Sequence, residues 1–123
     1  MLRHPGEKRT TGETKTVFVK KIDNGYQLYR NGKPFYIKGA SGNSYLKELA
    51  DIGGNTIRVY DTLNLMNILN EAQKNNLAVV VDIYIPGFQP LNNPYSINEN
   101  NHLLKENVTK FVKKYKSHPA VLF

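Results

Sequence analysis

The chain has 123 residues, a formal net charge of +7, and neither cysteine nor tryptophan. This length suits one domain with a single core, and it is too short for a complete eight-stranded parallel barrel of about 250 residues. Without cysteine the chain has no disulfide, thiol nucleophile or thiolate metal ligand. Its histidines are scattered, so we expect no metal site and no cofactor.

The N-terminal residues 1–15 are polar and contain Gly and Pro, so we expect a disordered basic tail there and a domain over residues 16–123. No apolar run approaches the roughly 20 residues that cross a bilayer, and the N-terminus lacks the apolar core of a secretory signal. We therefore expect no membrane span, and the cytoplasm is the default location.

The residues that follow this tail have the sequence pattern of β-strands. Residues 16–21 and 26–30 are rich in β-branched and aromatic side chains and flank the turn Asp23-Asn24-Gly25, which predicts a hairpin. A second turn at residues 31–34 leads into a third predicted strand at 35–40.

Helical periodicity then alternates with apolar strands. The spacing of apolar residues predicts helices over residues 45–52 and 65–74, ended by Gly53-Gly54 and Asn75-Asn76, and a third helix from Leu104 to Tyr115. Strands are predicted at 55–60, at 77–85 and from Pro119 onward, and a loop at 86–98. Strands that alternate with helices predict an α/β fold with a parallel sheet, and this order alone leaves an open sheet and a barrel as alternatives.

Positive charge is concentrated in two segments. Residues 1–21 and 105–116 each carry a net charge of +4, whereas residues 22–104 carry −1. A basic tail and a basic helix could contact nucleic acid or an anionic surface. Charge alone supports only non-specific binding, so we favour a solvated helix face and expect no specific nucleic acid partner.

Polar side chains interrupt two of the predicted parallel strands near their carboxyl ends, where such folds place their sites. Side-chain alternation puts Arg58 and Tyr60 on one face, and Asp82 and Tyr84 on the same face of the neighbouring strand. Arg58 and Asp82 should then point into the same interior, and a buried carboxylate or guanidinium needs a partner, so we expect an Arg58–Asp82 ion pair there. The cluster suits either binding of sugar hydroxyls or a purely structural role, and both remain open.

The carboxylates limit the chemistry. Of the ten acidic residues only Asp61 and Asp82 lie near strand ends, and Asp61 is explained more simply as a helix cap. A glycosidase of the usual kind needs two carboxylates that flank the scissile bond. We therefore assign no catalytic residue.

Four segments together resemble clan A glycoside hydrolases, most closely the catalytic domain of glycoside hydrolase family 2. They are NGKPFYIKG at residues 31–39, NTIRVY at 55–60, LAVVVDIYI at 77–85 and YKSHPAVL at 115–122. The NTIRVY segment is also similar to fungal-type β-1,3-glucanosyltransferases. The resemblance covers about residues 26–123.

This resemblance implies a (β/α)8 TIM barrel that hydrolyses O-glycosidic bonds with retention, through two Glu residues located beyond Phe123. We expect the N-terminal half of such a barrel, with about four parallel strands and three helices behind a β-hairpin. We also expect little or no hydrolase activity from this chain alone, and self-association through unclosed barrel edges.

The resemblance carries over Arg58 as an active-site residue, and Tyr60, Asp82 and Tyr84 follow by position. Asn43 stands after the first parallel strand, where the chain departs from the family pattern. These five are our candidate substrate-binding residues, with a carbohydrate as the partner. A non-catalytic carbohydrate-binding module and a basic nucleic-acid-binding protein are the alternative functions.

Overall fold

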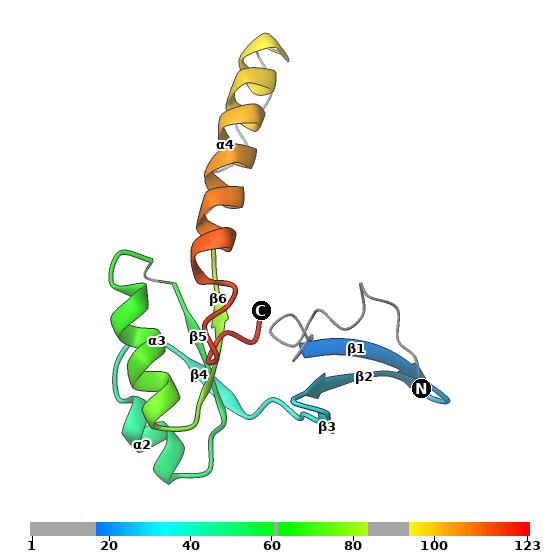
Figure 1. The fold of residues 1–123 in the computed structure, drawn as a ribbon, viewed down its shortest axis with the longest axis vertical. Coiled ribbons are helices and arrows are strands. Elements are labelled where there is room, and N and C mark those ends of the chain that lie inside the picture. The colour runs from blue at the N-terminus through cyan, green and yellow to red at the C-terminus, as the bar shows by residue number, and fades with distance from the viewer. Residues whose placement is uncertain (1–16, 61, 84–93) are drawn as a thin grey trace, which may run out of the picture. The chain divides into compact units, whose positions relative to one another are not determined.

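A computed structural model gives the fold and describes residues 17–60, 62–83 and 94–123. The chain forms two compact units, of which one ends at Tyr36 and the other begins at Ile37. The first holds an antiparallel sheet of three strands, and the second holds a parallel sheet of three strands together with the helices (Figure 1).

The first unit is the predicted hairpin with a short third strand added. Its strands are β1 (Val17–Ile22), β2 (Gly25–Arg30) and β3 (Lys33–Pro34), in the order β1-β2-β3. Asn31 and Gly32 both have positive φ, at 53° and 81°. Both central residues of a type I′ turn need this conformation, which explains the Asn-Gly pair between β2 and β3.

The expected third strand at residues 35–40 is mostly absent, because residues 35–38 belong to no strand. The chain pairs instead on either side of that segment: β3 lies in the expected turn and pairs with β2 in the first unit, and β4 (Gly39–Ser41) belongs to the parallel sheet of the second. An extended segment has the same sequence pattern whether or not it is hydrogen bonded, so its pairing partner is decided by tertiary structure.

The parallel sheet of the second unit has the order β4-β5-β6, with β5 at Thr56–Val59 and β6 at Ala78–Val81. Helix α2 (Leu46–Asp51) connects β4 to β5, and α3 (Leu65–Lys74) connects β5 to β6. Both helices lie on the same side of the sheet (Figure 1). Between them and the sheet lies the core, whose buried members are Leu46, Ile57, Val59, Leu65, Ile68, Leu69, Ala72, Leu77, Val79, Tyr115 and Ala120.

Helix α2 is shorter than its apolar pattern predicts. Tyr45 and Ile52, which the pattern places on the buried face, flank the helix and are 75% and 84% exposed. The helix is followed by Gly53 with φ of 95°, and α3 is followed by Asn76 with φ of 59°. These residues accept the left-handed conformation common after helix ends, so both predicted helix ends are confirmed.

The prediction of a partial TIM barrel with four parallel strands is wrong. The parallel sheet has three strands, and the segment expected as the fourth forms only an isolated bridge between Val79 and Val121. Its backbone bonds to β6 include Val79 N–H to the Ala120 oxygen at 2.7 Å and Leu122 N–H to the Val79 oxygen at 2.7 Å. The alternation of strands and helices is common to barrels and small open sheets, whereas a barrel also requires strand tilt and stagger that close the sheet.

Helix α4 (Pro94–Tyr115) begins earlier than predicted, inside the segment expected as a loop up to residue 98. Proline is favoured at the first helical position because that residue's N–H has no helical partner. Tyr115 is buried in the core, and the Phe111 ring lies 4.8 Å from it between centroids. The lysines of residues 105–116 are all exposed, as the solvated-face interpretation expects. Among the described helices, none combines the length and the apolar character needed to cross a membrane.

Candidate functional site

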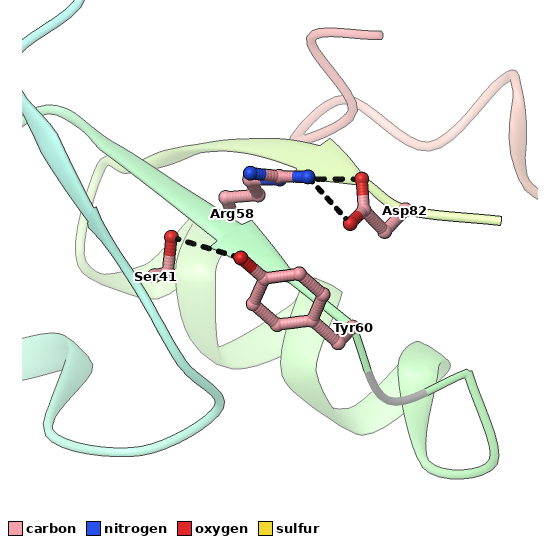
Figure 2. A network of polar contacts seen from close by, with 4 residues as sticks. All are labelled: Ser41, Arg58, Tyr60 and Asp82. Carbon is pink, nitrogen blue, oxygen red and sulfur yellow. Dashed lines mark hydrogen bonds and ion pairs between the residues drawn. The ribbon is translucent and has the colours of Figure 1, made fainter. Parts of the chain in front are cut away.

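The candidate site lies where the three parallel strands end. Ser41 closes β4 and is paired in register with Arg58 of β5, which is itself paired with Val80 of β6. Asp82 follows Val80 by two residues and therefore returns to the same face of the sheet. Ser41, Arg58, Tyr60 and Asp82 form one network of polar contacts (Figure 2).

Arg58 and Asp82 form a bidentate ion pair. Nε of Arg58 donates to Oδ1 of Asp82 at 3.2 Å, and Nη2 donates to Oδ2 at 2.8 Å. Two parallel bonds fix the orientation of the guanidinium as well as its position. The ion pair predicted from side-chain alternation is confirmed, but the expectation that it is buried in the sheet interior is wrong.

The pair is open to solvent, because the side chains of Arg58 and Asp82 are 51% and 33% exposed. Exposed ion pairs of this kind contribute little to the stability of a fold. A ligand can therefore reach the charged groups without unfolding anything around them.

Tyr60 lies against the guanidinium from another direction. Its ring centroid is 4.9 Å from Cζ of Arg58, within the range of a cation–π contact. Its hydroxyl is 3.5 Å from Oγ of Ser41, at the long end of a hydrogen bond. Asp82 thus binds one edge of the Arg58 guanidinium through hydrogen bonds, and the Tyr60 ring makes a cation–π contact with it (Figure 2).

The neighbouring carboxylate of Asp82 stabilises the charged form of Arg58. The hydrogen bond and the Coulomb attraction from Asp82 raise the pKa of Arg58 above its ordinary value. The guanidinium therefore remains a cation throughout the physiological pH range, and it can serve as a fixed donor but not as an acid or base.

The structure brings three of the five sequence-predicted site residues together, namely Arg58, Tyr60 and Asp82. Asn43 is exposed in the loop after β4, and among the described residues no hydrogen bond or ion pair involves its side chain. Tyr84 lies outside the described residues, as does Asp61.

Ser41 belongs to the network and is absent from the sequence prediction. Its position beside Arg58 follows from the β4–β5 register. A strand of three residues carries too little alternation to reveal that register in advance. A serine close to the end of the first parallel strand is the only signal that could have suggested it.

The network offers hydrogen-bond donors and acceptors at close range. Arg58 has five N–H groups, of which Asp82 engages two, and Asp82, Tyr60 and Ser41 supply oxygen acceptors. A neutral ligand with many hydroxyl groups matches this mixture, because each hydroxyl both donates and accepts. In the part of the chain that the structure describes, no group of three or more His, Asp or Glu side chains could hold a metal ion.

Comparison with known proteins shows no family: no protein-family model matches the chain, and no curated protein matches it. The fold and the site together define a small α/β unit with a polar cluster at the carboxyl ends of three parallel strands.

Proposed function

We propose that this chain binds carbohydrate through Arg58, Asp82 and Tyr60, as the sugar-binding part of a retaining glycoside hydrolase that acts on O-glycosidic bonds. The observation that carries the proposal is the solvent-open bidentate pair with a tyrosine ring against its guanidinium. The resemblance of residues 31–39, 55–60, 77–85 and 115–122 to glycoside hydrolases supports the same substrate class.

Hydrolysis by this cluster alone is not part of the proposal. A retaining mechanism needs a nucleophile and a separate acid/base carboxyl group about 5 Å apart. Asp82 is the only carboxylate in the described network, and both its oxygens accept bonds from Arg58. We therefore expect binding of sugar with little or no cleavage.

Titration calorimetry with a panel of neutral oligosaccharides tests the proposal. We expect heat with at least one of them, and Arg58→Ala to weaken its binding about tenfold or more, because charged hydrogen bonds to the ligand are lost. Asp82→Asn should weaken binding less, since its amide keeps the shape and one acceptor oxygen of the carboxylate.

The matched control is Lys47→Ala, which breaks a second exposed ion pair, Lys47–Asp51 on α2, with an Nζ–Oδ2 distance of 2.7 Å. That pair lies outside the site network, so its loss should leave binding unchanged. If no oligosaccharide gives heat, or if Arg58→Ala and Lys47→Ala bind equally well, the Arg58–Asp82 pair is structural and the proposal fails.

A further inference from the structure

Tyr45 adopts an unfavourable backbone conformation. Its φ of 59° and ψ of 35° place it in the left-handed region, which side chains with a Cβ rarely adopt. Among the described residues, the other non-glycine residues with positive φ are Asn31 and Asn76. Asparagine tolerates this conformation well, whereas a bulky tyrosine does not.

Packing within the fold does not explain why tyrosine occupies this position. The side chain is 75% exposed, and no capping hydrogen bond from it to α2 is formed. The backbone oxygen of Tyr45 accepts a bond from Leu49 N–H at 3.0 Å, but any residue could supply that oxygen. An exposed and strained residue of this kind suggests a role in function.

Tyr45 is also close to the site along the chain. Gly42 N–H donates to the Arg58 oxygen at 2.9 Å, so the loop after β4 starts beside the site. Tyr45 follows Gly42 by three residues, which limits the separation of their Cα atoms to about 11 Å. Tyr60, 54% exposed, begins the next loop at the same edge of the sheet.

We propose that Tyr45 is a ligand-contacting residue of this site, whose exposed ring stacks on the C–H face of a sugar ring while Arg58 and Asp82 bind hydroxyl groups. This inference rests on the proposed carbohydrate binding and adds an apolar contact with the sugar ring to the polar contacts from Arg58 and Asp82. Sugars have an apolar C–H face as well as hydroxyls, and a tyrosine ring offers a large rigid surface at low entropic cost.

The test compares Tyr45→Asn with Ile52→Asn in the full 123-residue chain. Both replace an exposed apolar side chain beside α2, but Ile52 follows the opposite end of that helix. The probe is the neutral oligosaccharide with the largest heat in the wild-type titration. We expect Tyr45→Asn to raise its Kd about tenfold and Ile52→Asn to leave it unchanged.

Thermal unfolding supplies a second measurement. Because asparagine suits the left-handed conformation, Tyr45→Asn should keep or raise the melting temperature while it weakens binding. Tyr45→Phe, which keeps the ring, should bind within about twofold of the wild type.

The outcomes separate the two proposals. If Arg58→Ala loses binding and Tyr45→Asn binds like the wild type, the role of Tyr45 is refuted and carbohydrate binding stands. If Tyr45→Asn lowers the melting temperature by several degrees, Tyr45 is structural and the inference is equally refuted. If the wild type binds no oligosaccharide, both proposals fall.

Discussion

Gly39 of β4 is paired in register with Thr56 of β5, and a single methyl group there should disturb the sheet. A Cβ added to Gly39 would be 2.1 Å from the carbonyl oxygen of Thr56 and 2.8 Å from its carbonyl carbon. Separations below 3.0 Å are essentially never seen for Cβ atoms. Since the obstacle is backbone, Gly39→Ala requires β4 to move away from β5 by about 1 Å.

The cost follows from the hydrogen bonds that hold β4 in place. Asn55 N–H donates to the Lys38 oxygen at 2.7 Å, and Gly42 N–H donates to the Arg58 oxygen at 2.9 Å. Each contributes about 1 kcal/mol, so losing both should lower the free energy of unfolding by about 2 kcal/mol. A domain of this size is typically stable by about 5–15 kcal/mol, so the variant should fold but with a clearly lower urea midpoint.

The assay is urea unfolding followed by far-UV circular dichroism, with Gly53→Ala as the control. Gly53 has φ of 95°, and no atom lies within 4 Å of the position that a Cβ would take there. Alanine at Gly53 should therefore cost only about 1 kcal/mol of backbone strain. If Gly39→Ala unfolds at the wild-type urea concentration, or costs less than Gly53→Ala, the close approach of β4 to β5 is refuted.

Two further predictions concern the buried core around Leu69 and the partly buried His118. Leu69 on α3 is fully buried, so Leu69→Ala should lower the free energy of unfolding in urea by about 2–5 kcal/mol. Met66, on the same helix, is 41% exposed, so Met66→Ala should lower it by well under half of that amount. Equal losses in the two variants would contradict the burial of Leu69 in the core. His118 should make the stability of the fold depend on pH. Its Nδ1 accepts the Ala120 N–H at 3.1 Å, and its Nε2 lies 2.9 Å from Oδ1 of Asn70. Burial lowers the pKa of His118 below its ordinary 6.5. The folded state then binds fewer protons than the unfolded state, so the melting temperature should fall as the pH drops below about 6.5. His118→Gln should reduce this dependence. If the melting temperatures of the wild type and of His118→Gln change identically with pH, the role of His118 is refuted.

Local features of the chain could be predicted from sequence because they depend on neighbouring residues. The hairpin and the helix ends after Asp51 and Lys74 follow from turn residues and from positions that accept positive φ. The Arg58–Asp82 contact was predictable too, since alternation sets the face of each side chain and parallel strands place their carboxyl ends together. The start of α4 at Pro94 was missed, because the polar residues that open this helix lack a helical apolar period.

Tertiary pairing decided what the sequence left open. The sequence by itself determined where the hairpin turns, where α2 and α3 end, and on which face Arg58 and Asp82 lie. Only the tertiary structure decided that the parallel sheet has three strands, that Ser41 lies beside Arg58, and that Tyr45 is an exposed flank of α2 and not part of its buried face. The physical reason is that strand number, register and exposure depend on contacts between distant segments, whereas turns and periodicity depend on residues that are adjacent in the chain.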